Sequence, residues 1–439
     1  MPSRPNMLVI MTDQQSHAAM GCAGNDAIAT PAMDSLAAAG VRFSQSYCTY
    51  PLCTPSRASM FTGQWPHAID VMDNGRPIPD AMRTTELGGL FSRAGYDCVY
   101  GGKWHVPEIA MPDGQHGFRT ICGFDDTHLA DRCIDYLRAR HDRPFLMVAS
   151  FDNPHNICEW ARGQVLPWGP IEERPLECCP NLPPNHASTG FEPEAIRMEQ
   201  AWSPRVYPVL NYSAERWRRY RNAYLRLVEK VDAEIGRILA ALRDAGLARD
   251  TLVVFTSDHG DGMGAHHWNQ KSVLYDEIVR VPLLLSWPGV IPEGRVDPRL
   301  VSTGLDLLPT LCDYAGISAP EGLPGRSLRE AVERASGATW RDQVCAETVL
   351  GRPIRMEGRM VRTARFKYVV YSYGLYREQL YDLERDPGEM VNLAVEERHS
   401  GVLAEHRRRL RDWCLETGDR FEEHSSHPGL PTVPGYEYV

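Results

Sequence analysis

The sequence contains no apolar run long enough to cross a membrane, since a membrane-spanning helix needs about 18 or more consecutive apolar residues. The apolar run nearest the N-terminus, Met7–Met11, is five residues long and leads into a polar Thr-Asp pair. It is too short for the hydrophobic segment of a signal peptide. We therefore expect no membrane span and a cytoplasmic location, or a periplasmic or secreted one if a leader has been removed.

The sequence also lacks an excess of basic residues. Its 47 Lys and Arg residues stand against 57 Asp and Glu residues, which gives a formal net charge of −10. Because binding to a phosphate backbone needs clustered positive charge, this balance argues against a nucleic-acid partner. It does not exclude a small anionic substrate, since a site can be locally cationic on an acidic protein.

The twelve cysteines show no regular spacing, and no C-x-x-C pair occurs among them. A compact secreted domain stapled by disulfides concentrates its cysteines in a short chain, whereas these are spread over 439 residues. The paired spacing of a zinc finger is also missing. Most of the cysteines have apolar neighbours, a setting in which a thiol usually acts as a small core residue.

Short apolar runs alternate with helical patterns along most of the chain. This alternation predicts an α/β fold in which helices flank a parallel sheet. The expected strands are Met7–Met11, Asp97–Tyr100, Phe145–Ser150, Leu252–Thr256 and Pro282–Ser286. The expected helices are Pro31–Ala39, Thr84–Ala94, Asp131–Arg140 and a long segment from a Ser213 N-cap to Gly246.

The composition predicts a large first domain, residues 1–344, and a small α+β domain, residues 345–439. The second part contains a β-rich stretch, Met360–Tyr373, followed by a basic amphipathic helix, Glu396–Thr417. Within the first part, residues 156–212 are rich in Pro, Cys and Trp and have no steady period. We expect this segment to be an insertion near the rim of a functional site.

Polar residues follow four of the predicted strands directly. In an open parallel sheet, ligands bind beyond the carboxyl ends of the strands, so these residues are expected to converge. Two carboxylates and one imidazole, from Asp13, Asp258 and His259, would suit a divalent cation. The alternative is that these aspartates only cap turns or helices, but that explanation has to hold at two separate strands.

Four basic side chains occupy related positions. Lys103 and His105 follow the second predicted strand, His155 follows the third, and Lys271 lies shortly after Asp258 in sequence. A single Lys or His in a loop is usually a solvated surface residue. Four of them close to strand ends indicate instead an anion site with groups able to transfer protons.

The segment Cys53–Arg57 has the pattern of a helix start. Pro55 suits the first turn of a helix that stops at Gly63, so Cys53 lies at the N-terminus. Free N–H groups and the helix dipole favour anions there and lower the pKa of a thiol, and Arg57 adds a positive charge one turn on. On this pattern alone, Cys53 is as consistent with a buried structural cysteine as with a nucleophile or a metal-bound thiol taken together.

At these residues the sequence resembles the type I sulfatases, the formylglycine-dependent family of the alkaline phosphatase superfamily. The family pattern is Cys-x-Pro-Ser-Arg followed by Thr-Gly, and it corresponds here to Cys53–Gly63. The resemblance covers nearly the whole chain, and its further blocks occur in the order of the family. They are Asp13, Gly102–His105, Pro154-His155, Ser257–Gly260, Gly264–His266, Lys271, Tyr275–Glu277, Arg280–Pro282 and Leu380–Leu393.

The resemblance implies the superfamily fold, with a large mixed, mostly parallel sheet between helices, and it makes residues 1–344 the catalytic domain. It also implies an unusual nucleophile at Cys53. In such enzymes a separate maturation enzyme oxidises this cysteine to formylglycine, which hydrates to a geminal diol. One hydroxyl attacks sulfur, and the second lets the sulfated intermediate collapse to the aldehyde and release sulfate. A plain cysteine or serine would lack that last route.

The resemblance further implies one divalent metal ion, bound by Asp13, Asp258, His259 and the modified Cys53. Ca²⁺ is the usual expectation for the family. This chain departs from many relatives by carrying Gln14 in place of a second Asp, and His259 in place of Asn. A less anionic site with an imidazole leaves Mn²⁺ or Mg²⁺ open. Gln14 remains a candidate ligand through its carbonyl oxygen.

The same resemblance assigns roles to the basic residues. Arg57 and Lys103 would stabilise the nucleophile and the charge of the sulfate, and His105 would handle the proton of the diol. Lys271 would hold the sulfate, and His155 would contact it or protonate the departing oxygen. The expected substrate-binding residues are Lys103, His155, Lys271 and His266.

Two other functions have to be weighed. A phosphonate monoester or phosphodiester hydrolase of the same superfamily can carry the same formylglycine, but such relatives tend to lack the lysine found here as Lys103. A catalytically inactive binding relative is disfavoured, because every position that the mechanism needs is occupied. The expected substrate is a small-molecule or saccharide sulfate ester, with a sulfated carbohydrate processed from its end preferred. Trp160, Trp168 and Trp202 could stack on a ring or simply pack. The oligomeric state is not defined by the sequence.

Overall fold

A computed structural model describes residues 4–202, 211–333, 339–351 and 355–421 of the chain. Its centre is an eight-stranded sheet with the order β4-β3-β5-β1-β6-β7-β2-β8. Strand β7 pairs antiparallel with β6 and β2, and the other five pairings are parallel. The predicted mixed, mostly parallel sheet is thus confirmed. The strands are β1 Asn6–Asp13, β2 Val41–Tyr47, β3 Asp97–Gly102, β4 Arg119–Cys122, β5 Phe145–Pro154, β6 Thr251–Ser257, β7 Leu283–Ser286 and β8 Arg295–Ser302.

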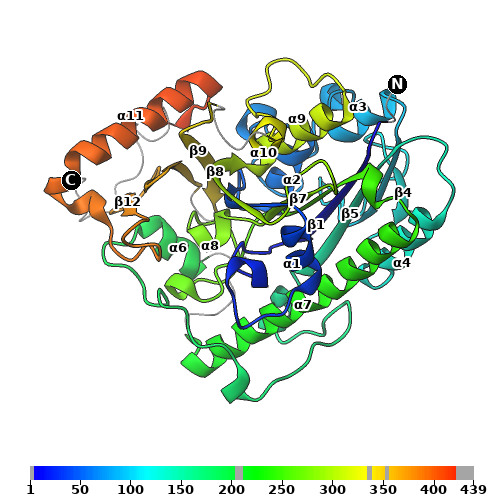
Figure 1. The fold of residues 1–439 in the computed structure, drawn as a ribbon. Coiled ribbons are helices and arrows are strands. Elements are labelled where there is room, and N and C mark those ends of the chain that lie inside the picture. The colour runs from blue at the N-terminus through cyan, green and yellow to red at the C-terminus, as the bar shows by residue number, and fades with distance from the viewer. Residues whose placement is uncertain (1–3, 203–210, 334–338, 352–354, 422–439) are drawn as a thin grey trace.

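Helices cover both faces of this sheet (Figure 1). On one face lie α1 Pro31–Ala38, α4 Asp126–Arg138 and α7 Ala214–Asp244, and on the other lie α2 Cys53–Thr62, α3 Leu87–Arg93, α9 Thr303–Ala315 and α10 Arg329–Glu333. Strand β1 shows why two layers are needed, because all of its residues are buried. Leu8 and Ile10 pack in the core with α7, whereas Met7 and Val9 pack in the core with α3 and α9. This alternation follows from the two-residue repeat of a strand.

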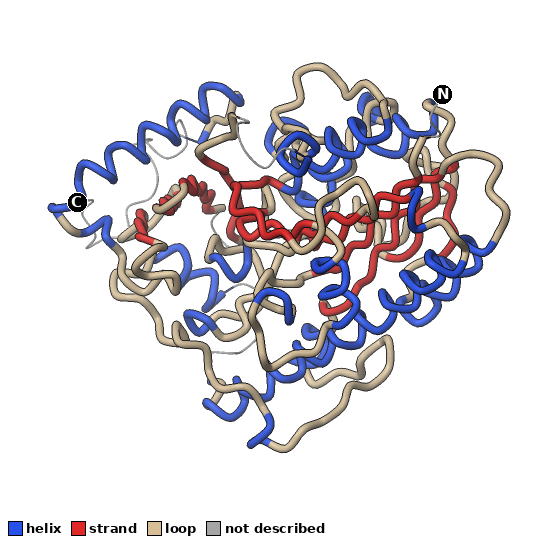
Figure 2. Tube along the Cα trace, viewed as in Figure 1, coloured by secondary structure: helices blue, strands red, loops and turns tan. Residues whose placement is uncertain are grey.

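A second, antiparallel sheet lies beside the C-terminal helix (Figures 1 and 2). Its strands are β9 Gln343–Leu350, β10 Met356–Thr363, β11 Phe366–Tyr371 and β12 Glu378–Asp382, in the order β12-β11-β10-β9. Helix α11, Ser400–Thr417, covers one face of it, where Leu410 and Trp413 share a core with Val361 and Tyr368. Three short helices complete the described chain: α5 Ile157–Ala161, α6 Glu194–Trp202 and α8 Asp276–Val279.

Several predicted boundaries were wrong. Helix α4 begins at Asp126 and not at Asp131, because the Asp125 carboxylate caps it by accepting a hydrogen bond of 2.8 Å from the Thr127 backbone N–H. Helix α11 begins at Ser400, since residues 397–399 form a separate 3-10 turn. The predicted β-rich stretch is two strands, β10 and β11.

The segment 156–212, predicted as an insertion near the rim of the site from its lack of a steady period, contains α5 and α6 in its described part. Residues 203–210 lie outside the description. By contrast, the Ser213 N-cap of α7 is confirmed, since its hydroxyl accepts from the Arg216 backbone N–H.

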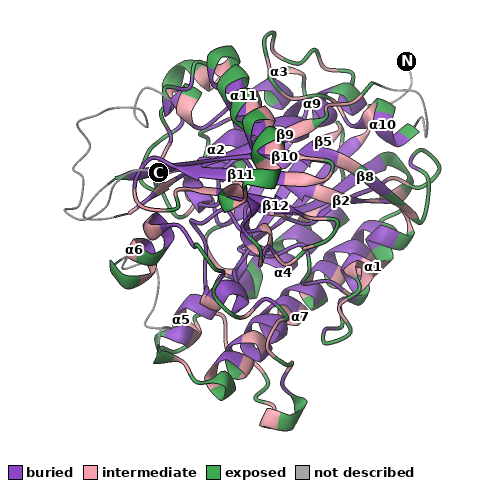
Figure 3. Cartoon of the chain, turned by 90° about the vertical axis from the view of Figure 1, so that its left-hand side faces the viewer, coloured by how far each residue is buried: buried purple, intermediate pink, exposed green. Residues whose placement is uncertain are grey.

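Burial follows this layered plan. The central strands β1, β5, β6 and β7 of the main sheet are buried, and exposed residues gather on the outer faces of the helices (Figure 3). Within the described ranges, no helix combines the length and the apolar character needed to span a bilayer. The polar exceptions inside the sheet therefore stand out, and they cluster where β1, β3, β5 and β6 end.

Candidate active site

Two neighbouring parallel strands bring the predicted carboxylates together. Asp13 ends β1, and Thr12 pairs with Ser257, the last residue of β6. Asp258 follows directly, so the two aspartates leave the same edge of the sheet side by side. Helix α2 begins at Cys53, as predicted, and ends at Gly63, whose φ of 68° is the left-handed conformation favoured by glycine.

Asp13, Cys53, Asp258 and His259 form one buried cluster. One ligand atom from each lies within 4.8 Å of the others, and all four residues are fully buried. Asp13 Oδ1 is 3.7 Å from Cys53 Sγ and 4.0 Å from His259 Nε2, and Asp258 Oδ1 is 3.7 Å from the same nitrogen. Two carboxylates, an imidazole and a sulfur are a set of donors that could bind a metal ion.

Arg57 holds the two carboxylates in place. Its Nη2 donates to Asp13 Oδ2 at 3.0 Å, and its Nε donates to Asp258 Oδ2 at 2.8 Å. Its Nη1 donates to the Lys103 carbonyl and to Ser150 Oγ. Because the guanidinium occupies Oδ2 of each aspartate, each Oδ1 stays directed at the cluster. The planar fork of Arg suits this bridging role.

The Cys53 sulfur is surrounded by basic groups. Lys271 Nζ lies 3.1 Å from Cys53 Sγ, and His259 Nε2 lies 3.3 Å from it. Burial and the charge of Asp13 raise the pKa of the Cys53 thiol, but Lys271, Lys103 and His259 outweigh them, so that the pKa is well below its ordinary value. The other cysteines with a large shift, such as Cys48 and Cys133, have a raised pKa because burial is not offset.

Lys103 reaches the cluster from the end of β3. Its ammonium is 2.9 Å from Asp13 Oδ2 and 2.9 Å from Asp152 Oδ1. Asp152, near the end of β5, is 3% exposed and was not among the predicted site residues. His155 Nδ1 lies 3.9 Å from the same Asp152 oxygen. The His155 side chain, 22% exposed, is one of the few groups of the site that reach solvent.

Gln14 is held beside the cluster by residues that sequence reasoning also missed. Its side-chain amide donates to Asp261 Oδ2 at 2.8 Å, and its backbone N–H donates to Asp258 Oδ1 at 3.0 Å. Its backbone carbonyl accepts from the Tyr224 hydroxyl. Tyr220 also donates to Asp261. The side-chain oxygen of Gln14 lies 3.9 Å from the thiol of Cys158. Its role as a metal ligand therefore stays a prediction.

Two predicted histidines, His105 and His266, are not members of the main cluster. The His105 carbonyl accepts from the Thr54 hydroxyl at 2.6 Å, and its ring Nδ1 has no hydrogen-bond partner among the described residues. The ring of His266 stacks on Tyr275 with 3.8 Å between centroids and belongs to a second group with Glu277 and Glu389. The substrate-binding role of His266 therefore stays a prediction.

Comparisons with known proteins agree with this fold. The family model described as Sulfatase matches residues 5–317, and the model described as N-sulphoglucosamine sulphohydrolase, C-terminal, matches residues 264–415. A Delta 4,5-hexuronate-2-O-sulfatase of Bacteroides thetaiotaomicron is 32% identical over 98% of this chain and 95% of its own. An ulvan-active sulfatase of Formosa agariphila is 26% identical over 100% of this chain and 88% of its own.

Solved structures show the same architecture. A structure described as a 2-O GAG sulfatase superposes with a TM-score of 0.85 at 30% identity and covers 99% of this chain and 98% of its own. The phosphonate monoester hydrolase of Agrobacterium radiobacter superposes with a TM-score of 0.78 at 24% identity, covering 94% of this chain and 96% of its own. The second likeness shows a shared fold and nothing about the reaction.

The fold and the buried cluster define a hydrolase of the alkaline phosphatase superfamily. Within it, the chain belongs to the sulfatase family, as its match over residues 5–317 shows. Its class of activity is sulfuric ester hydrolysis.

Proposed function

We propose that this enzyme hydrolyses the sulfate ester of a carbohydrate, a 2-O-sulfated hexuronate at the end of a saccharide, through a formylglycine made from Cys53. The observation that carries the chemistry is the position of Cys53 Sγ, which contacts Lys271 and His259 beside two buried carboxylates. The substrate class is supported by the hexuronate-2-O-sulfatase that matches this chain over nearly its full length. A formylglycine-generating maturation enzyme is then a required partner.

The donor set fits a divalent metal ion. Asp13, Asp258, His259 and the oxygen of the modified Cys53 would hold it, since carboxylates and oxygen suit Ca²⁺, Mg²⁺ and Mn²⁺, and an imidazole suits Mn²⁺ better than Ca²⁺. Bound there, such an ion would supply Lewis-acid chemistry that makes an oxygen nucleophile more acidic. Ca²⁺ remains the family expectation, with Mn²⁺ and Mg²⁺ as the alternatives.

The residues of the chain divide the remaining work. Arg57 orients both carboxylates and offsets their charge. Lys103 and Lys271 would bind the sulfate oxygens, where negative charge grows in the transition state. His155, at the solvent-facing side, would donate a proton to the departing sugar oxygen. His105, whose ring Nδ1 lacks a partner within the described chain, would take the proton of the nucleophile.

The reaction class is tested with the protein produced together with a formylglycine-generating enzyme. An aryl sulfate and a phenyl phosphonate ester are compared as substrates, and the sulfate is expected to react much faster. A dominant phosphonate activity would instead favour the rival reaction. Mass spectrometry of the peptide spanning Cys53 has to show the aldehyde. Cys53→Ala has to be inactive, whereas Cys178→Ser, at an exposed cysteine, has to be fully active.

The substrate class is tested separately with defined saccharides. A disaccharide carrying a 2-O-sulfated hexuronate at its non-reducing end is compared with isomers sulfated on the amino sugar and with the same uronate placed internally. Release of sulfate from the first alone supports the proposal. Release from the 6-O-sulfated amino sugar alone would contradict the substrate and leave the reaction class standing.

A further inference from the structure

We propose that Asp152 is a positioning residue of the active site, which sets the Lys103 ammonium and is itself held by Trp168 and Asn156. The proposal rests on the function proposed above. Asp152 lies in the part of β5 that runs past the predicted strand end, where its side chain turns toward Lys103. The distance from Asp152 Oδ1 to Lys103 Nζ is 2.9 Å, and both side chains are buried.

Lys103 is shared between two carboxylates. An ammonium has three donors, and within the described chain Asp13 Oδ2 and Asp152 Oδ1 account for two of them, each at 2.9 Å. The third remains for an anion such as a sulfate oxygen. Asp13 has other tasks, since Arg57 binds its Oδ2 and its Oδ1 faces the cluster of donors. Within the described chain, Lys103 is the nearest basic partner of Asp152, since the next one, His155 Nδ1, lies 3.9 Å from Asp152 Oδ1. The pairing with Asp152 would therefore set where the third donor of Lys103 points.

Two residues from the segment 156–212 hold Asp152 in this orientation. Its Oδ2 accepts from the indole N–H of Trp168 at 2.9 Å and from the side-chain amide of Asn156 at 2.7 Å. Both donors bind one oxygen, which leaves Oδ1 for Lys103. The backbone N–H of Asp152 donates to Asp126 at 2.8 Å, so the main chain is held as well. The carboxylate is thus held by three hydrogen bonds and the main chain by a fourth.

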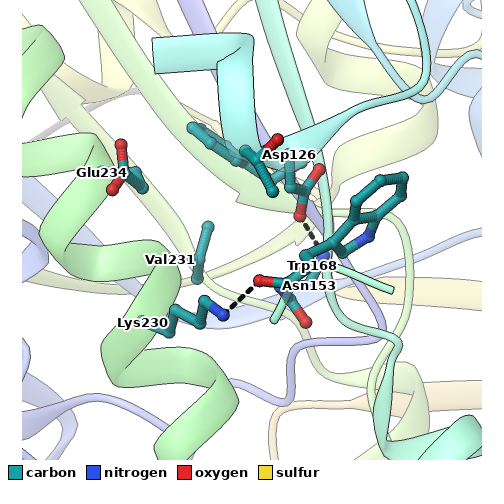
Figure 4. Close-up of a pocket in the computed structure, with 8 residues that line it drawn as sticks. Asp126, Asn153, Trp168, Lys230, Val231 and Glu234 are labelled. Carbon is teal, nitrogen blue, oxygen red and sulfur yellow. Dashed lines mark hydrogen bonds between the residues drawn. The ribbon is translucent and has the colours of Figure 1, made fainter. Parts of the chain in front are cut away.

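The loop that carries Trp168 is anchored to α7. Figure 4 shows Trp168 beside Asp126, Asn153 and Lys230, around a cavity of about 200 Å³. Lys230 donates to the carbonyls of Trp168 and Gly169, and the Trp168 ring meets Phe124 edge to face at 5.2 Å. The indole is thus held by an aromatic contact as well as by its hydrogen bond to Asp152. Of the three tryptophans considered as stacking groups, Trp168 contacts the site, whereas Trp202 is 67% exposed.

The test compares variants for kcat, KM, melting temperature and formylglycine content on an aryl sulfate. Asp152→Asn keeps the shape of the side chain but introduces an amide N–H₂ donor where Lys103, Asn156 and Trp168 all donate. The kcat is expected to fall about 10- to 100-fold, the usual effect of losing a partner that orients a site residue. KM should change far less, because the variant still binds substrate. Asp152→Glu, which restores the charge, is expected to recover part of kcat.

Trp168→Phe provides a second, milder variant, since it removes only the N–H donor and keeps an aromatic ring in the loop. We expect kcat to fall by several fold at an unchanged melting temperature, whereas Trp202→Phe, in the same segment but 67% exposed, should match the wild type. Full kcat in both Asp152→Asn and Trp168→Phe would overturn the inference, as would a loss that only follows melting temperature or formylglycine content. An inactive wild type would instead refute the proposed function.

Discussion

The Lys271 ammonium lies 3.1 Å from the Cys53 sulfur, and both side chains come from segments 218 residues apart. In the proposed reaction, this contact would place a positive charge at the point where the nucleophile and the substrate sulfate meet. Lys271 is 6% exposed, so the charge is only weakly screened by water. It also helps to lower the pKa of the Cys53 thiol.

Replacing Lys271 by Met should therefore lower kcat/KM on an aryl sulfate by about 10²- to 10³-fold, the range for losing one group that stabilises transition-state charge. Lys271→Arg should retain more activity than Lys271→Met. Arg140→Ala, at an exposed ion pair, is the control and should have no effect. Equal losses in the Arg and Met variants, at normal formylglycine content, would mean that the charge is not what matters.

Removal of Arg57 should destabilise the protein because two buried carboxylates lose their shared partner. Breaking a buried ion pair costs about 3–5 kcal/mol, so Arg57→Ala should lower the free energy of unfolding by about that amount in chelator-treated protein. Added Ca²⁺ or Mn²⁺ should restore part of the loss, since a cation bound between Asp13 and Asp258 would offset their charge. Denaturant unfolding with and without metal measures both effects. A stability that is insensitive to metal would contradict the proposed role of the cluster.

The sequence predicted the residues that leave the strand ends but not the ones that support them. Asp13 and Asp258 were found because parallel strands deliver their ends to one edge. Asp152 was missed because β5 continues to Pro154, so that a carboxylate inside the strand counted as neither loop nor core. Helical periodicity places Tyr220 on the buried face of α7, but it does not reveal that the hydroxyl of Tyr220 reaches Asp261.

Strands β2 and β8 were not predicted from the sequence, for a similar reason. Strand β8 has the sequence RVDPRLVS, with charges and a proline, which is tolerated because it lies at the edge of the sheet. Strand β2 has the sequence VRFSQSY, with three consecutive polar residues, and it pairs with this edge strand. Patterns of local apolar residues detect strands that are buried on both faces, and they fail where tertiary pairing alone completes the strand.

The ion pair between His67 and Glu347 should make stability depend on pH. Burial lowers the pKa of His67, but the hydrogen bond and charge of Glu347, with Nδ1 to Oε2 at 3.1 Å, and the charge of Asp419 raise it above the ordinary value overall. Because the folded-state pKa is the higher one, the stabilisation is complete below the unfolded pKa of about 6.5 and is lost as pH rises through the folded pKa.

His67→Gln should thus lower the free energy of unfolding by about 1–3 kcal/mol at pH 6, the scale of a hydrogen bond to a charged group, and by less at pH 9. Denaturant unfolding of both proteins at the two pH values measures the difference. His128→Gln, at an exposed helix start, serves as the control because its ion pair with Asp125 is largely solvated. A deficit of His67→Gln that grows with pH would contradict the assignment of the charged imidazole.

Metal preference should follow from how His259 is held. Its ring Nδ1 lies 3.0 Å from the Gly260 carbonyl, which accepts the Nδ1–H and so directs Nε2 at the cluster, where a bound metal ion would take the place of the Nε2 proton. A neutral imidazole with that orientation is a ligand for Mn²⁺ more than for Ca²⁺.

The test compares the wild type with His259→Asn after chelation, which should abolish activity. The wild type should then regain activity at a lower Mn²⁺ concentration than His259→Asn requires. The Asn variant, with a hard oxygen donor in place of nitrogen, should shift its preference toward Ca²⁺. The measurement is a titration of kcat with each metal for both proteins, with formylglycine content matched. If both proteins rank Ca²⁺, Mn²⁺ and Mg²⁺ identically, then the carboxylates alone set metal choice, and His259 acts on the nucleophile and not on the ion.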